Sequence, residues 1–383
     1  MAVPGLKWQM STSVSSDRHR VKQTVRQFGM WLFLIAFCWF GTAFGLRWLA
    51  IRNADQGRVT RARHLLEWSR RLSWNDTRSN SLVAECARRK NDVDNWSKFM
   101  NDWTAIASSS REVKIERELM RVQNGEFAPN PQAQLNQLVD AGTGYDSVAD
   151  AFVRGFLARQ DLEQAMRVLN AWELNGTRTA EVRIHQAKIA RMKGDFDESR
   201  SLLEDALNRC PHHELAHELL GELLLELRLP RAAAHHYLEV IREDSESISG
   251  RVGLAHCLRQ CADWDGARLV IRGAVASQNC PSAIIQELGE IELESGSYEA
   301  SVAAFRRASS HLERNSEGRM AAATAFVLSG DRTEADRLIA IDASQKSLKK
   351  QLRDIQIQIR LNPTNFEAQR SLERIREQLQ MAR

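Results

Sequence analysis

The strongest constraint on the fold of this chain is a small residue that recurs every 34 positions between Asp146 and Lys346. The six residues of this column are Ala165, Ser199, Ala233, Ala267, Ser301 and Ala335. Four positions after each comes a bulky residue, in order Leu169, Leu203, Tyr237, Ile271, Phe305 and Ile339. Twelve positions before each comes a third column, mostly small: Val153, Ala187, Gly221, Ala255, Gly289 and Ala323. A fixed period of this length indicates stacked helical hairpins, because two short helices cannot bury an apolar face alone whereas successive copies share one core.

These columns resemble those of the tetratricopeptide repeat (TPR), a family with small residues at the close helix contacts of each unit and a proline near its end. The copy that begins at Ala180 matches the family pattern with Gly194, Phe196, Ser199, Leu203, Ala206 and Pro211. Other copies depart from it, since Pro230 and Arg332 replace aromatic residues and Asp342 replaces an alanine. The resemblance implies an all-α, right-handed solenoid of helical hairpins that binds other proteins.

A long apolar segment precedes the repeats. Residues 1–27 are polar and basic, and we expect them to form a disordered tail. No charged residue interrupts the sequence from Phe28 to Leu46, which is long enough to cross the hydrocarbon core of a bilayer as a helix. We therefore expect an uncleaved transmembrane helix over residues 28–51, which would make the chain a single-pass membrane protein.

The charges beside this segment bear on its orientation. Arg18, Arg20, Lys22 and Arg26 precede it, and five arginines follow within residues 47–63, so the raw count does not decide. Short flanking tails weigh more than long domains in the positive-inside rule. This favours the repeats on the non-cytoplasmic side, with the anchor in a bacterial inner or plasma membrane.

Three further regions follow the predicted anchor. Residues 52–145 carry degenerate, repeat-like helical patterns, in which Trp96 occupies a position that is normally small. Residues 146–345 hold six repeats of 34 residues. Residues 346–383 contain two amphipathic helices separated by Asn362-Pro363. Solenoids need polar terminal caps, and we expect this last pair to serve as one.

The charge balance argues against a nucleic-acid partner. The 53 basic and 49 acidic residues are interleaved and leave a net charge of +4, which is typical of solvated helices. Six cysteines show no disulfide-framework spacing. Cys257 and Cys261 are one helical turn apart, where burial as small apolar side chains, a disulfide and a metal site are alternative interpretations.

One motif suggests catalysis. His213-Glu214-Leu215-Ala216-His217 matches H-E-x-x-H, in which two histidines on one helix face bind zinc and the glutamate acts as a base. The repeat frame explains the same residues as the first helix of a copy, and Leu220 and Leu224 occupy the places of the glycine and third histidine of the longer motif. A zinc hydrolase that uses this motif therefore remains only an alternative, with His213 and His217 as weak candidate metal ligands. We expect no enzyme and no cofactor.

The resemblance places the binding surface on the first helix of each repeat, which lines a groove in the TPR family. The charged positions carried over to this chain are Arg154, Lys188, Arg191, Glu218, Glu222, Glu226, His256, Arg259, Glu290 and Glu294. Their bands of alternating charge suit an extended peptide or a helix of complementary charge, although solvated helix faces are the alternative. We expect a scaffold for protein partners in bacterial envelope assembly or complex organisation. A self-association module, with the chain as a homo-oligomer, is a further alternative.

Overall fold

The computed structural model describes residues 42, 44–71, 77–107, 110–142, 144–275, 280–312, 316–361 and 366–381. These residues form a helical stretch over residues 44–55 and the nineteen helices α2 to α20, and they contain no strand. The chain divides into two compact units, Met1–Arg178 and Thr179–Arg383. Each unit is built from helical hairpins stacked on one another, so the prediction of an all-α solenoid of helical hairpins is confirmed.

The first unit contains helices α2 to α8, preceded by a further helical stretch. The helices are α2 (Val59–Arg71), α3 (Thr77–Arg89), α4 (Val93–Ala107), α5 (Arg111–Gln123), α6 (Pro131–Asp140), α7 (Tyr145–Ala158) and α8 (Leu162–Asn175). Leu66 and Trp103 are fully buried in a core shared by α2, α3 and α4. Trp96 packs at the edge of this core, where its Nε1 donates to the Glu116 carboxylate at 3.3 Å.

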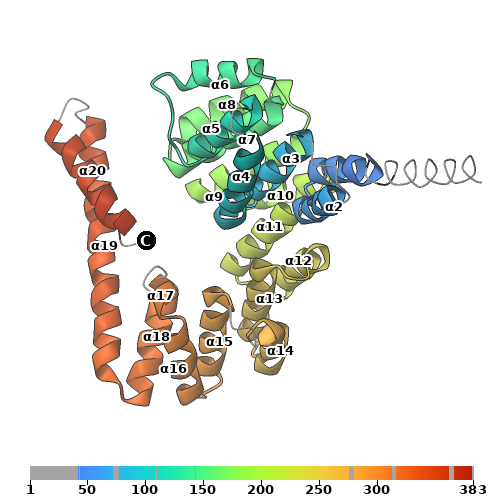
Figure 1. The fold of residues 1–383 in the computed structure, drawn as a ribbon. Coiled ribbons are helices and arrows are strands. Elements are labelled where there is room, and N and C mark those ends of the chain that lie inside the picture. The colour runs from blue at the N-terminus through green and yellow to red at the C-terminus, as the bar shows by residue number, and fades with distance from the viewer. Residues whose placement is uncertain are drawn as a thin grey trace, which may run out of the picture. The chain divides into compact units, whose positions relative to one another are not determined.

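The second unit is itself a stack of helical hairpins. Its helices are α9 (Thr179–Lys193), α10 (Phe196–Arg209), α11 (Glu214–Glu226), α12 (Pro230–Glu243), α13 (Ile248–Gln260), α14 (Trp264–Val275), α15 (Ser282–Glu294), α16 (Tyr298–Arg307), α17 (Ser309–Leu312), α18 (Ser316–Ser329), α19 (Arg332–Leu361) and α20 (Phe366–Met381). Consecutive helices pair as hairpins, and α9, α11, α13, α15 and α18 are the first helices of successive hairpins (Figure 1).

The repeating columns form the core of these hairpins. All six small residues of the 34-residue column are at most 1% exposed. The bulky column is buried as well, apart from Ile339, which is 44% exposed because it lies in the last copy and no further copy covers it. The periodicity therefore marks helix contacts, as expected for hairpins that share a core.

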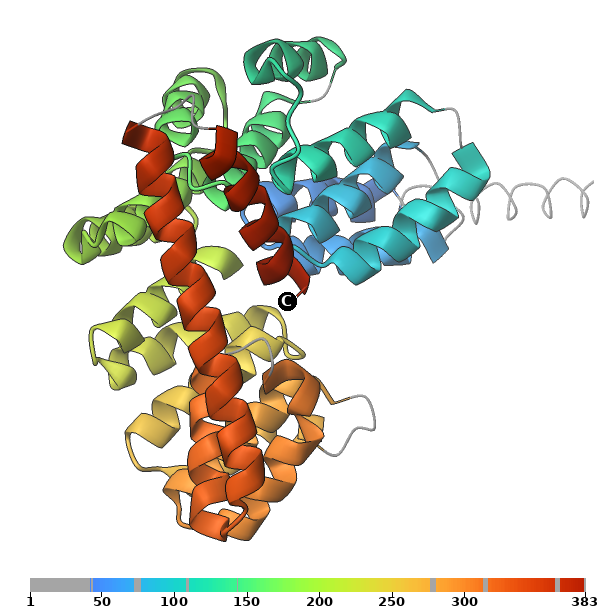
Figure 2. The same cartoon turned by 90° about the vertical axis from the view of Figure 1, so that its left-hand side faces the viewer.

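Two features interrupt the regular stack. α16 has 10 residues, four fewer than the equivalent helices α10 and α12. It ends at Arg307, and the short helix α17 follows. α19 is a single helix of 30 residues that continues without a break past residue 345, the end of the last predicted repeat. Figure 2 shows α19 as a long rod with α20 folded back along its far half, in agreement with the contacts between these two helices.

The prediction of a single-pass membrane protein is corrected. Among the residues that the structure describes, no helix is long and apolar enough to cross a membrane. Most of the predicted anchor, residues 28–41 and 43, lies outside the described residues. The end of the predicted anchor belongs to a helical stretch over residues 44–55, which buries Ala50 and Ala54 in the core of the first unit. The tail over residues 1–27 also lies outside the described residues.

The Tyr237 ring shows how closely the hairpins pack. It lies between Gly221 on α11 of its own hairpin and Gly253 on α13 of the next. A Cβ atom added at Gly221 would lie 2.9 Å from two ring carbons, and one added at Gly253 would overlap the ring. Tyr237 is only 3% exposed, so the ring has little room to move aside.

We expect Gly253→Ala to lower the free energy of unfolding by about 1–3 kcal/mol, because overpacking a filled core forces neighbouring groups to shift. The matched control is Gly273→Ala on α14, where an added Cβ meets no atom within 4 Å. The control should gain roughly 0.5–1 kcal/mol from the better helix propensity of alanine. Thermal unfolding of both variants checks the prediction, and equal shifts would contradict it.

Candidate functional site

The predicted groove residues of the second unit lie on the first helices of its hairpins. We call this surface, formed by the outward positions of α9, α11, α13, α15 and α18, the first-helix face. Lys188 and Arg191 lie near the end of α9, and the three predicted glutamates of α11 follow on the next helix. Arg154 lies on α7 and therefore belongs to the first unit rather than to this face.

The charges of α9 and α11 pair with one another. Arg191 donates to Glu222 at 2.7 Å and to both carboxylate oxygens of Glu226, at 2.6 and 3.2 Å. The arginine side chain is 28% exposed, and the two glutamate side chains are 41% and 43% exposed. The ion pairs therefore join two consecutive first helices at a surface that water reaches.

The same arrangement recurs two repeats later, where it is buried more deeply. Arg259 on α13 donates to Glu290 at 2.8 Å and also pairs with Glu294, both on α15. These partners are 31 and 35 positions after the arginine, as Glu222 and Glu226 are after Arg191. A third carboxylate, that of Glu287, accepts from Arg259 Nε at 2.9 Å.

Glu287 distinguishes the two arginine sites. It is 4% exposed, and Leu219 occupies the equivalent place on α11. Burial raises the pKa of Glu287 to about 7, and the neighbouring Glu290 and Glu294 carboxylates add to the increase although Arg259 opposes it. One guanidinium thus faces three carboxylates at this site, whereas Arg191 faces two.

The remaining predicted groove residues make other contacts. Arg154 donates to Asp150 at 2.9 Å and to the Arg89 carbonyl at 3.0 Å. His256 lies 2.9 Å from the Gln260 amide, and burial followed by the nearby Arg259 and Arg228 lowers its pKa to about 4. Lys188 and Glu218 are half-buried on the same face. The structure therefore brings six of the ten predicted residues together, as two clusters around Arg191 and Arg259.

A third arginine cluster in the first unit was not predicted. Arg88 on α3 is fully buried, and it donates to Glu116 at 2.9 Å, Gln123 at 3.3 Å and Ser147 at 2.7 Å. A sequence signal for it exists, because Glu116 follows Arg88 by 28 positions, the same interval that separates Glu287 from Arg259. An arginine that binds a carboxylate one hairpin ahead thus occurs in both units.

The two histidines of the H-E-x-x-H motif turn to different neighbours. His213 caps α11, where its Nδ1 accepts from the Ala216 amide, and its Nε2 lies 3.7 Å from Glu181 of α9. His217 donates from Nε2 to the Pro211 carbonyl at 3.0 Å, and its Nδ1 lies 3.0 Å from Nδ1 of His236 on α12. Within the described part of the chain, no group of three or more His, Cys, Asp or Glu side chains is placed to hold a metal ion.

The five cysteines among the described residues are free thiols. Cys86, Cys210, Cys257, Cys261 and Cys280 form no disulfide in the structure. Cys257 is 1% exposed, and burial raises its pKa to about 12. Its thiol therefore fits the interpretation of a small buried apolar side chain.

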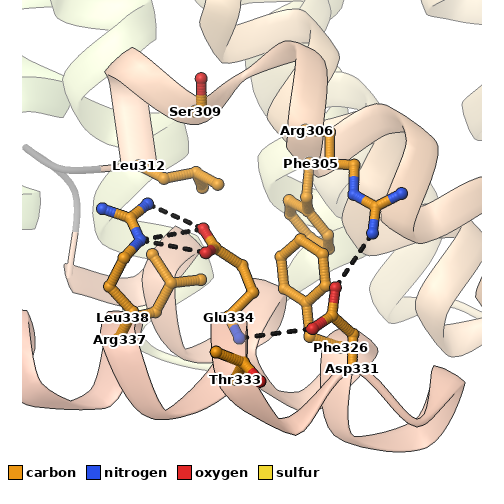
Figure 3. A pocket seen from close by; sticks show the side chains of 10 residues that line it. All are labelled: Phe305, Arg306, Ser309, Leu312, Phe326, Asp331, Thr333, Glu334, Arg337 and Leu338. Carbon is orange, nitrogen blue, oxygen red and sulfur yellow. Dashed lines mark hydrogen bonds and ion pairs between the residues drawn. The ribbon is translucent and has the colours of Figure 1, made fainter.

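A pocket of about 340 Å³ lies away from the first-helix face, between α16, α17, α18 and α19 (Figure 3). Its base is apolar, because Phe305, Phe326, Leu312 and Leu338 are each at most 2% exposed. Two ion pairs form its rim, Arg306 with Asp331 at 3.0 Å and Arg337 with Glu334 at 2.8 Å. The volume is at the lower end of the range for ligand pockets, and none of the predicted groove residues lines it.

Comparisons with known proteins support the fold. By sequence, no protein-family model and no curated protein matches the chain. By structure, it is similar to the crystal structure of the Cut9–Hcn1 hetero-tetramer of the APC/C, with a TM-score of 0.52 and 15% identity. That alignment covers 82% of this chain and 59% of the other.

Shorter structures align with part of the chain. A TPR protein of Thermus thermophilus aligns with 51% of this chain and 98% of its own, with a TM-score of 0.36 and 16% identity. PilW, described as a type IV pilus biogenesis factor, aligns with 54% of this chain and 94% of its own, with a TM-score of 0.39 and 17% identity. At these identities the comparisons concern the fold alone, which is the TPR-type stack of helical hairpins.

We expect Arg259→Met to destabilise the protein by about 3–5 kcal/mol, because it leaves three carboxylates together without their buried cation. Arg191→Met is the matched control, since its partners stand at the same spacing but at an exposed surface, and it should cost less than about 1 kcal/mol. Urea unfolding of both variants measures the difference. Equal losses would show that burial does not distinguish the two clusters.

The contact between His217 and His236 leads us to expect that the protein loses stability in acid. Burial, followed by His217 and His235, lowers the pKa of His236 to about 4 in the folded protein from an ordinary 6.5. The unfolded chain then binds the proton first, so stability falls as the pH decreases from 6.5 towards 4. The other groups around this ring are Glu204 on α10 and Glu239 on α12.

His236→Leu should therefore lose less stability than the wild type when the pH decreases from about 7.5 to about 5, as measured by thermal unfolding at each pH. His235→Leu changes an exposed ring on the same helix and should keep most of the wild-type pH dependence. An unchanged pH dependence in His236→Leu would contradict the assignment.

Proposed function

We propose that this protein is a non-enzymatic scaffold that binds protein partners along the first-helix face. The observation that carries the proposal is the pair of arginine-centred clusters, which fix charged side chains in defined positions on four consecutive first helices. Charges that are already held in place need little ordering when a partner binds, and fixed charge patterns favour one partner over another.

The TPR-type fold supports the same surface. Each hairpin contacts its neighbours, so the first helices form a continuous row whose outward positions change from charged to apolar along the stack. Rows of this kind present extended surfaces for peptides or helices. The H-E-x-x-H motif gives no competing proposal, because its two histidine rings contact Glu181 and His236 and are not directed at one site.

A photo-crosslinking residue tests the proposal when it replaces Glu222 or Gln260 on the first-helix face. Matched controls replace Leu238 on α12 and Leu269 on α14, which are exposed on second helices. We expect crosslinks to a protein partner in cells from the first pair of positions only, identified by mass spectrometry. Equal crosslinking from both pairs, or none from the first, would contradict the proposal.

The identity of the crosslinked protein tests two finer expectations. A component of the bacterial envelope would support the predicted role in envelope assembly. A second copy of this chain as the main product would favour the self-association alternative instead.

A further inference from the structure

The last first helix of the stack, α18, carries an exposed apolar stripe. Met320, Val327 and Leu328 are 43%, 49% and 51% exposed, and Thr324 between them is exposed as well. These four residues follow the spacing i, i+4, i+7 and i+8, which places them along one side of the helix. We call them the α18 stripe.

The core of the unit does not require this stripe. The opposite side of α18 buries Ala322, Ala323 and Phe326. In the 34-residue register, Thr324 corresponds to Glu290 on α15 and Glu222 on α11, and Leu328 corresponds to Glu294 and Glu226. Of the three apolar residues, Leu328 stands where α15 has Glu294 and α11 has Glu226, whereas Val327 stands where both helices have a leucine that is partly buried. Isolated exposed apolar residues are common, but three on one side of one helix indicate a surface that another molecule covers.

The neighbouring charges indicate what that molecule carries. Glu290 and Glu294 contribute −2 and Arg259 contributes +1, which leaves −1, and the Glu287 carboxylate, whose pKa is raised to about 7, adds further negative charge where it is ionised. The cluster lies beside α18, because the Gln286 amide donates to Glu290 at 2.8 Å and its side chain packs against Gly318 of α18. Glu294 stands on α15 at the position equivalent to Leu328 of the stripe, and its side chain is 44% exposed, so this carboxylate of the cluster is accessible to a partner.

We propose that the α18 stripe and the Arg259 cluster together bind a basic amphipathic helix of a protein partner. This inference rests on the proposed function and names the chemistry of the bound segment. The stripe extends over eight residue steps, about 12 Å or two helical turns, which matches the apolar residues at i, i+4 and i+7 of a docked helix. Lysine or arginine beside that apolar side would complement the excess negative charge, whereas an acidic segment would be repelled.

The binding test uses three synthetic peptides of about 18 residues, long enough to form a helix of five turns. The probe carries leucine at helical spacing and lysine elsewhere, the second replaces every lysine with glutamate, and the third has the composition of the probe in scrambled order. We expect the full-length protein to bind the probe at least about tenfold more tightly than either of the others, measured by fluorescence anisotropy. Equal binding of the glutamate peptide or of the scrambled peptide would overturn the proposal.

Variants then place the binding site. Val327→Ser with Leu328→Ser should weaken probe binding at least about tenfold, and Glu294→Gln should weaken it about threefold. Leu269→Ser on α14, where the leucine is 66% exposed, should leave binding unchanged. Circular dichroism confirms that each variant is folded, as expected for substitutions at exposed positions. Unchanged binding in the α18 variant would overturn the proposal.

Two results separate this inference from the proposed function. Crosslinking from Glu222 and Gln260 to a partner whose bound segment is not basic would retain the scaffold and overturn the inference. A wild-type protein that sediments as a dimer, together with a monomeric Val327→Ser, Leu328→Ser variant, would assign the stripe to contact between copies and overturn it as well.

Discussion

The structure depends on one packing constraint, the contact of a small residue on one helix with a bulky residue on another. A hairpin of two helices of about fourteen residues has no interior of its own, so each copy must use its neighbour as the other half of its core. Alanine, serine and glycine at the close contacts let the helices approach, and Leu203, Tyr237 and Phe305 fill the space beside them. Ile339 lies in the last copy, which has no following copy to supply the other half of its core, and its side chain is exposed.

A second set of contacts uses charge to join consecutive first helices. Arg191 and Arg259 bind carboxylates at the same two intervals, which shows that the repeat fixes the geometry of the ion pairs as well as that of the apolar core. Their surroundings differ, because Leu219 on α11 corresponds to Glu287 on α15. The buried Arg259 site thus has one carboxylate more than the exposed Arg191 site.

The sequence was sufficient to predict the hairpin architecture but only part of the site. The columns at Ala165 and Leu169 could be read directly, since a 34-residue period has few structural explanations. Ion pairs such as Arg191 with Glu222 depend on the register between neighbouring hairpins. The sequence therefore predicted which charged residues lie on the first helices but not which of them pair. The contact of His217 with His236 joins two helices and has no short-range pattern. The α18 stripe was missed because the predicted groove positions ended at α15, and the membrane prediction came from hydropathy alone, although Ala50 packs in a core.

The continuity of α19 has a consequence for how the end of the stack comes apart. In most of the second unit, a turn separates each helix from the next, so one layer can fray while its neighbour stays folded. α19 belongs to two layers at once, since its first part packs on α18 and α20 packs along it. Loss of α20 would leave the far half of a 30-residue helix without a neighbour among the described helices, and the helix–coil boundary could then move along α19 towards α18. We therefore expect the terminal layers to unfold together, so that the order of α20 bears on the surface of α18 although the two helices are joined only through α19.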